Sequence, residues 1–304
     1  MLSEDQLQHF ETFGFLVLKN ALAPGEVQTL REESDRRSEE ASRYVRFDGT
    51  KSRDMSALGS TTPFTASLFE DDRLAGVGEQ IFDELICANA TAHRYVGDSE
   101  WHYDAGGYDA YGIKFAIYLD PVRADSGALR VIPGTHKRPF HDQVAEFDPV
   151  GPRWSRAAAT PEEKQRALAA IGSIPCYVCD SDPGDIVAFD LRLYHASLGG
   201  CVDRRMCSFT YYNYPHAPAE IELTILNARG HTSRSDNSSD PWNPPGYPEE
   251  WLTNPHNNPR RNAWIQHLRQ FSQMELEQRG VRAVVENGKW KIAPSPGSAV
   301  EQGT

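Results

Sequence analysis

A histidine and an aspartate near the middle of the chain could bind a metal ion. His102 and Asp104 are two positions apart, ahead of an apolar run at 113–119. On an extended segment, residues i and i+2 point to the same side, so the imidazole and the carboxylate would converge on one point. A facial iron site uses two histidines and one carboxylate and leaves positions open for other ligands. This pair would supply two of those three protein ligands.

A second histidine and an arginine pair follow in strand-like segments. His195 comes after the apolar run 186–190, and Arg204 and Arg205 stand at the start of a strand expected at 206–214. A guanidinium binds a carboxylate bidentately in a fixed plane, which suits the distal carboxylate of a metal-bound 2-oxo acid. Because side chains alternate along a strand, only one of the two arginines would face inward.

Several other residues near these motifs have metal-ligand chemistry. Asp109 and Asp190 stay open as alternative carboxylate ligands, and Asp104 is favoured for its offset from the histidine. His136 and His141 lie in or near a turn and are expected at the surface. The Cys-x-x-Cys stretch at 176–179 has no second pair at metal spacing, so inert thiols are expected there.

A set of short strands must position these residues. From about residue 86, apolar runs alternate with Gly, Pro, Asp and Asn. This punctuation is typical of a β-sandwich or barrel. The expected strands are 91–96, 101–104, 113–119, 128–132, 186–190 and 206–214.

Helices are expected on both sides of the strand-rich part. Ser3 followed by Gln6 is a capping-box pattern, which predicts a helix that stops at Gly14 before a strand at 15–18. Pro24 suits the first turn of a second helix. The other expected elements are helices at 66–85, 160–170 and 260–279 and a long loop at 46–64.

Length and composition are typical of a globular protein and permit a neutral or cationic small substrate. The 304 residues can bury a sizeable core. The net charge of −12 argues against a nucleic-acid partner, which would require a basic face. No segment approaches the ~20 apolar residues of a membrane span, and the N-terminus does not resemble a secretory signal. Five cysteines fit a reducing compartment, so a cytoplasmic protein is expected.

One domain over 1–304 is the simplest organisation. Its expected parts are N-terminal helices (3–85), a barrel core (about 86–214), a C-terminal loop and helix (215–290) and a disordered tail (291–304). Either a monomer or a small homo-oligomer is expected.

The ordered set of motifs resembles the phytanoyl-CoA dioxygenase (PhyH) family of Fe(II)/2-oxoglutarate oxygenases. The resemblance begins at 3–33, with a helix, a Gly-Phe strand and a Pro-started helix. It continues in WHYD (101–104), SGALRVIPGTHK (126–137), PGDIVAFDLRLYHAS (183–197) and DRRMCSFTYY (203–212). It implies a mainly β fold with flanking helices around a double-stranded β-helix, a jelly-roll, cupin-like core.

The resemblance also implies a ligand set and cofactors. Carried over position by position, it assigns the metal ligands to His102, Asp104 and His195. It assigns 2-oxoglutarate binding to Arg204 or Arg205. Arg204 is slightly favoured because it stands seven positions before Tyr211, as the family's arginine stands before an aromatic, whereas counting from Tyr212 selects Arg205. The implied cofactor is Fe(II), with 2-oxoglutarate as cosubstrate and O2.

The implied activity is that of a 2-oxoglutarate-dependent dioxygenase. It would hydroxylate or otherwise oxidise an unactivated C–H bond and release succinate and CO2. Asp104 predicts oxygenation over halogenation, because halogenases of this type have a small residue there that lets chloride bind. The alternative is a non-catalytic, cupin-like metal- or ligand-binding module.

The substrate is expected to be a polar small molecule or secondary metabolite, because no basic cluster suggests a site for coenzyme A. Loops select the substrate in such folds, here 46–64, 105–112 and parts of 215–255. Four residues could line the pocket: Trp101, Tyr108, Tyr111 and Lys114. Tyr103, between the two ligands, is expected to point away from the metal.

Overall fold

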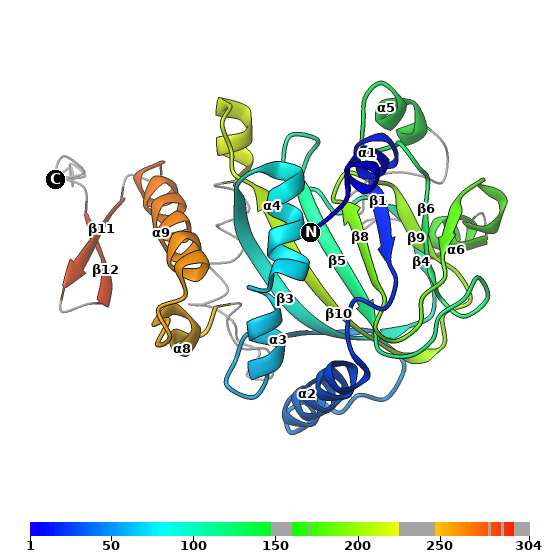
Figure 1. Ribbon diagram of the computed structural model, residues 1–304, viewed down its shortest axis with the longest axis horizontal. Helices are drawn as coiled ribbons and strands as arrows, with labels where there is room; N and C mark the ends of the chain where they lie inside the picture. Colours follow the sequence, from blue (N-terminus) through cyan, green and yellow to red (C-terminus); the bar gives the residue numbers. More distant parts are fainter. Residues whose placement is uncertain (147–159, 170, 225–246, 279–280, 287–288, 295–304) are drawn as a thin grey trace, which may run out of the picture.

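Two antiparallel sheets form the centre of the molecule (Figure 1). The computed structural model describes residues 1–146, 160–169, 171–224, 247–278, 281–286 and 289–294. The larger sheet has the order β1 (Phe15–Leu18), β8 (Ile186–Asp190), β5 (Gly112–Tyr118), β10 (Val202–Asn213), β3 (Leu85–Val96) and β2 (Arg53–Ser56). The smaller sheet has the order β4 (Ser99–His102), β9 (His195–Ser197), β6 (Leu129–Val131) and β7 (Tyr177–Cys179).

Apolar side chains from both sheets fill the space between them. One buried cluster joins Tyr118 and Met206 of the larger sheet to Leu129 and Val131 of the smaller sheet. Alternation along β10 sends Phe209 to the opposite face, where it packs in the cluster that the helices cover. The larger sheet therefore has an inner face, toward the smaller sheet, and an outer face, toward the helices.

Both faces of the larger sheet are covered, as the burial pattern of its strands shows. All five residues of β8 are buried, as expected for a strand with packing on both sides. β10 is the central strand, since it pairs with β3 over its whole length and with β5 from Met206 to Tyr212. Strand β1 pairs with β8, so the segment that follows the first helix completes one edge of the sheet.

Helices surround these sheets (Figure 1). They are α1 (Glu4–Phe13), α2 (Pro24–Ser42), α3 (Pro63–Leu68), the π-helical turn η1 (Asp72–Gly76), α4 (Val77–Phe82), α5 (Phe140–Ala145), α6 (Pro161–Ala169), the 3-10 turn η3 (Ile171–Ser173), α8 (Glu249–Leu252) and α9 (Pro259–Gln278). The predicted capping box of α1 is present, with Ser3 Oγ accepting from the Gln6 N–H and the Gln6 side chain accepting from the Ser3 N–H. None of the helices in the described ranges has the length and apolar character that a bilayer span requires.

Three segments differ from the sequence prediction. The expected loop 46–64 contains β2, a four-residue strand at the sheet edge that is too short to show a pattern. The expected helix 66–85 is three short helical segments, because Asp71 caps a new turn by accepting from the Arg73 N–H. Residues 281–294 form a hairpin of β11 (Val281–Glu286) and β12 (Lys289–Pro294).

That hairpin corrects the predicted tail, because residues 291–294 belong to β12. Lys289 to Ile292 alternate between basic and apolar residues, and this strand pattern was overlooked. The rest of the expected tail, 295–304, lies outside the described residues.

Candidate metal centre

Two histidines lie side by side on neighbouring strands of the smaller sheet. His102 ends β4 and His195 begins β9, and they are partners in the antiparallel pairing, with ring centroids 4.2 Å apart. Asp104 follows β4, and its backbone N–H donates to the Leu191 carbonyl at 2.8 Å. Asp104 Oδ1 lies 3.6 Å from His102 Nε2, and Oδ2 lies 3.6 Å from His195 Nε2. One ligand atom from each residue lies within 4.8 Å of the other two, which is close enough to share one metal ion.

Backbone carbonyls contact one ring nitrogen of each histidine. His102 Nδ1 lies 2.6 Å from the Glu100 carbonyl oxygen, and His195 Nδ1 lies 2.9 Å from the Leu193 carbonyl oxygen. A carbonyl only accepts, so Nδ1 carries a proton in each ring, and in the neutral imidazole the lone pair is then on Nε2. Such contacts fix the tautomer and orientation of metal-binding histidines. Two neutral imidazoles and a carboxylate therefore fit a divalent metal ion.

Lys114 reaches this cluster from the larger sheet. Its Nζ donates to Asp104 Oδ2 at 2.7 Å, and the two side chains are 16% and 11% exposed. Tyr212 also lies near the carboxylate: burial raises its pKa to about 12, and the negative charge of Asp104 adds to the effect. The carboxylate is thus sheltered and in contact with a cation of the opposite sheet.

Arg204 extends from β10 into the space between the sheets. Its side chain is buried, and its Nη2 donates to Ser197 Oγ at 3.2 Å. Its Nε and Nη1 have no hydrogen-bond partner in the part of the chain that the structure describes. Gly127 makes room for it, because a Cβ there would lie 1.8 Å from Nη1. This buried guanidinium contacts Ser197, which stands two positions past His195 on β9, and it fits the far carboxylate of a dicarboxylate.

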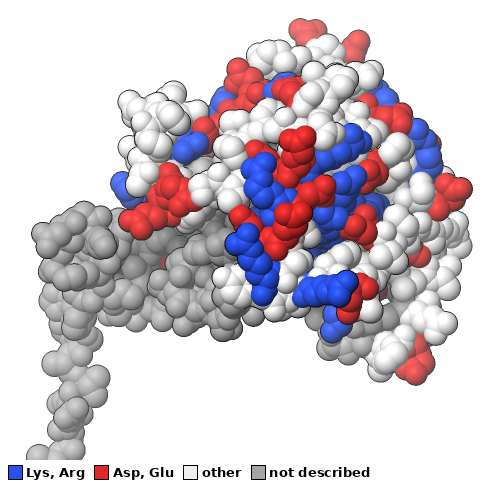
Figure 2. All heavy atoms as spheres, turned by 90° about the horizontal axis from the view of Figure 1, so that it is seen from below, with Lys and Arg blue, Asp and Glu red and all other residues white. Residues whose placement is uncertain are grey.

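Arg205 points to the other face and is already paired. Its guanidinium contacts Asp120 at 2.7 Å and Asp35 at 3.2 Å, and Asp35 also contacts Arg94. Figure 2 shows acidic and basic side chains interleaved on the side of the molecule that carries α2. Of the two candidate arginines, only Arg204 is brought toward the metal-ligand cluster.

The other predicted pocket residues divide into two groups. Tyr108 and Tyr111 lie beside Arg192, whose guanidinium carbon is 5.2 Å and 4.5 Å from their ring centroids. Trp101 is fully buried in the apolar cluster behind β4, so it packs the strand instead of lining a pocket. Tyr103 lies in the same cluster, which confirms that it points away from the metal ligands.

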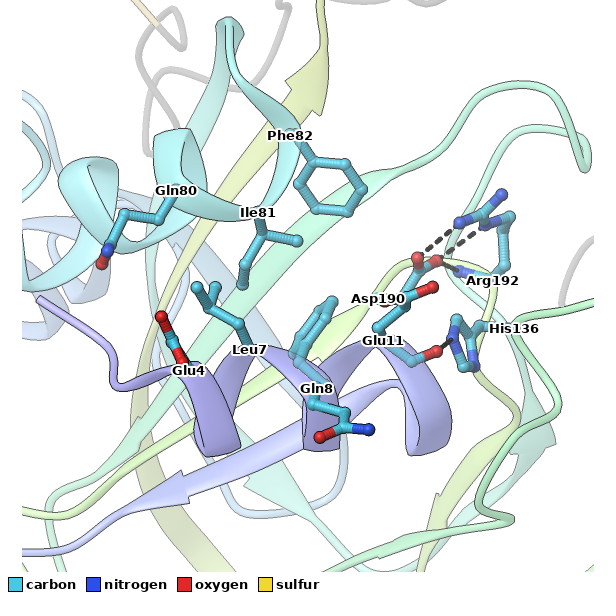
Figure 3. Close-up of a pocket in the computed structure, with 11 residues that line it drawn as sticks. Glu4, Leu7, Gln8, Glu11, Gln80, Ile81, Phe82, His136, Asp190 and Arg192 are labelled. Carbon is cyan, nitrogen blue, oxygen red and sulfur yellow. Dashed lines mark hydrogen bonds and ion pairs between the residues drawn. The ribbon is translucent and has the colours of Figure 1, made fainter.

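Neither alternative carboxylate joins the cluster. Asp109 is exposed. Asp190 is buried and binds Arg192 through both of its oxygens (Figure 3). That pair lies at the edge of a separate cavity of about 480 Å³ between α1 and α4, which the three ligand residues do not line.

The prediction that His136 and His141 lie at the surface is wrong. Both are nearly fully buried. His136 Nε2 donates to the Glu11 carbonyl at 3.0 Å, and His141 Nδ1 donates to the Thr135 carbonyl at 2.8 Å. Burial lowers the pKa of each. The two histidines therefore have a structural role: their hydrogen bonds hold the turn and its neighbouring segments in place.

The roles of Ser197 and Gly127 beside Arg204 were not anticipated. Ser197 stands two residues after His195 on the same strand, so alternation could have placed it on the face of the metal ligand. Gly127 has a positive φ of 88°, which suits a turn, but the space it leaves for Arg204 depends on a strand far along the chain.

The sequence is similar to a family model and to curated dioxygenases. The family model described as phytanoyl-CoA dioxygenase (PhyH) matches residues 10–205. An ectoine dioxygenase of Bordetella bronchiseptica is 26% identical over 155 residues, which are 45% of this chain and 50% of that protein. A dioxygenase named sphC, from Aspergillus fumigatus, is 24% identical over 46% of each chain. This chain therefore spans about half the length of the curated relatives it matches.

Solved structures share the fold. HygX from Streptomyces hygroscopicus, with nickel and 2-oxoglutarate bound, is similar with a TM-score of 0.52 and 20% identity. The similarity covers 69% of this chain and 87% of HygX. The prediction of a jelly-roll core with flanking helices is confirmed.

Proposed function

Because this chain belongs to the phytanoyl-CoA dioxygenase family, we propose that it is an Fe(II)- and 2-oxoglutarate-dependent oxygenase. One observation carries the proposal. Two histidines and an aspartate converge, each histidine with Nδ1 on a backbone carbonyl and Nε2 toward the aspartate. A buried arginine lies nearby, and two of its nitrogens have no partner among the described residues. A core histidine or a structural salt bridge would not require this combination. The proposed metal ligands are His102, Asp104 and His195.

Arg204 is the proposed anchor of 2-oxoglutarate. Its Nε and Nη1, which bond to none of the residues that the structure describes, would donate to the distal carboxylate beside Ser197. The buried guanidinium, which is costly to bury alone, would then be paired. The Phe189 ring, 4.8 Å from the ring of His195, packs against the centre and keeps water from that side. When bound together, Fe(II) and 2-oxoglutarate supply the oxygen-activating chemistry, which consumes O2 and releases succinate and CO2.

Asp104 favours oxygenation over halogenation. Its carboxylate would take the position that a halide would need. The Asp104 backbone N–H donates to the Leu191 carbonyl, and the carboxylate itself accepts from Lys114. The protein's own task is then to bind the substrate with one C–H bond close to the metal and to exclude water.

The proposed substrate is a polar small molecule or secondary metabolite. The basic residues Arg94 and Arg205 are neutralised by aspartates and form no open site for the phosphates of coenzyme A. Tyr108, Tyr111 and Lys114 are the proposed polar contacts for the substrate; Lys114 lies on Asp104, and the two tyrosines lie beside Arg192. Nucleic acid is not a proposed partner. A cytoplasmic location is also proposed, supported by five cysteines that are all unpaired.

Succinate formation tests the proposal. The purified protein, supplied with Fe(II), 2-oxoglutarate and O2, should form succinate, and removing O2 or substituting Asp104→Ala should abolish it. A protein that binds neither metal nor 2-oxoglutarate would refute the oxygenase assignment. One that binds both but forms no succinate with any tested metabolite would instead be the non-catalytic binding module.

A further inference from the structure

Lys114 stands in an unusual place for a lysine. It lies on the inner face of β5, where the neighbouring inward residues of its strand, Ala116 and Tyr118, belong to the apolar cluster between the sheets. Its partners across the strands are Thr210 and Phe189. A lysine is rarely buried unless it is paired, because removing the ammonium from water is costly. The partner that compensates here is the proposed carboxylate ligand itself.

The carboxylate of Asp104 has two oxygens within reach of a shared metal ion. Oδ1 is 3.6 Å from one histidine Nε2 and Oδ2 is 3.6 Å from the other. A carboxylate can bind a metal through one oxygen or through both. A centre that must accept a chelating 2-oxo acid and O2 requires three open positions, so it tolerates only one oxygen from the protein carboxylate.

We infer that Lys114 is a positioning residue that holds Oδ2 of Asp104 by its 2.7 Å hydrogen bond, so that the carboxylate binds the metal through Oδ1 alone. This inference rests on the proposed metal centre. The hydrogen bond is charge-assisted and sheltered, since both side chains are mostly buried, so water competes with it weakly. Lys114 thereby keeps the third position open.

The test uses Mn(II) as the probe, because this ion favours the same ligand types and water-proton relaxation counts the water molecules bound to it. Lys114→Met keeps the length of the side chain and removes its donors. Lys114→Arg restores a donor. Lys19→Met is the matched control, because Lys19 also pairs with a buried aspartate, Asp185, which is not a member of the ligand cluster.

In Lys114→Met, the Mn(II) form should lose one bound water, because the second carboxylate oxygen takes its place. The dissociation constant of 2-oxoglutarate should rise on the order of tenfold, which corresponds to the free energy of about one charge-assisted hydrogen bond. Lys114→Arg should restore both values, and Lys19→Met should match the native protein.

An unchanged water count in Lys114→Met would overturn the inference, even if 2-oxoglutarate bound more weakly, because the lysine would then act through its charge alone. If the native protein failed to bind Mn(II) together with 2-oxoglutarate, the proposed metal centre itself would be wrong.

Discussion

Removing the guanidinium of Arg204 should have opposite effects on the ligand-free and the ligand-bound protein. In the ligand-free protein, Nε and Nη1 are buried without partners in the described structure, and each such group costs about 1–3 kcal/mol. Arg204→Met keeps much of the apolar stem and removes these groups. The ligand-free variant should therefore be as stable as the native protein or more stable, by roughly 1–3 kcal/mol.

The same substitution should remove 2-oxoglutarate binding. A hydrogen bond to a charged group contributes about 1.5–3 kcal/mol. Losing a bidentate pair should raise the dissociation constant by roughly 10²–10⁴. Thermal unfolding of the Mn(II)-loaded protein with and without 2-oxoglutarate measures both effects. At a 2-oxoglutarate concentration of about 100 times its dissociation constant, the native protein should gain about 2.7 kcal/mol, and Arg204→Met should gain almost nothing.

Arg205→Met is the matched control. Arg205 is partly exposed and pairs with Asp120 and Asp35, so its loss should cost about 0–1 kcal/mol. The stabilisation by 2-oxoglutarate should remain. The reasoning is refuted if Arg205→Met loses that stabilisation and Arg204→Met keeps it, or if Arg204→Met strongly destabilises the ligand-free protein.

Three further substitutions test other contacts. Gly127→Ala would place a Cβ 1.8 Å from Nη1 of Arg204, at a φ of 88°. In calorimetry, it should raise the dissociation constant of 2-oxoglutarate by roughly tenfold or more. The control Gly25→Ala, whose Cβ would have nothing within 4 Å, should leave that constant unchanged. Burial lowers the pKa of His141, so below about pH 6.5 the unfolded chain binds more protons than the folded protein, and stability should fall as the pH drops. In urea unfolding at pH 7 and pH 5, His141→Phe should reduce this loss of stability. An unchanged loss would show that His141 is not its cause. Glu33 is buried and accepts three hydrogen bonds from the first turn of α3; Glu33→Ala should cost about 3 kcal/mol in urea unfolding, and a loss near zero would show that the cap is not needed.

The metal-ligand cluster was partly readable from the sequence. Side-chain alternation is a local property, so His102 and Asp104 could be assigned to one side of a strand from their spacing alone. That His195 lies opposite His102 depends on the pairing of β4 with β9, and pairing register between distant segments cannot be read from a single sequence. The family resemblance supplied what local pattern could not.

The choice between Arg204 and Arg205 shows a second limit. Alternation predicted that only one would face inward, and counting from two neighbouring tyrosines gave both answers. The register of β10 against β3 shifts at two places, between Val202 and Arg204 and between Thr210 and Tyr211. A bulge adds a residue to one strand. The inward and outward alternation counted from a strand end is therefore shifted by one residue beyond the bulge.

The burial of His136 and His141 was missed for a similar reason. Their turn is polar in sequence, but His136 is tied to the end of α1 and His141 packs against the rings of Tyr103 and Tyr194. These partners are distant in sequence and come together only when the barrel closes. Turn composition predicts local backbone shape and not which side chains other elements will cover.

The central claim is tested most directly by a crystal structure of the native protein grown without oxygen, with Fe(II) and 2-oxoglutarate. One metal ion is expected on Nε2 of His102, Nε2 of His195 and a single oxygen of Asp104. The distal carboxylate of 2-oxoglutarate is expected on the guanidinium of Arg204, beside Ser197. Density for metal and 2-oxoglutarate anywhere else, or bound metal with 2-oxoglutarate on Arg205, would contradict it.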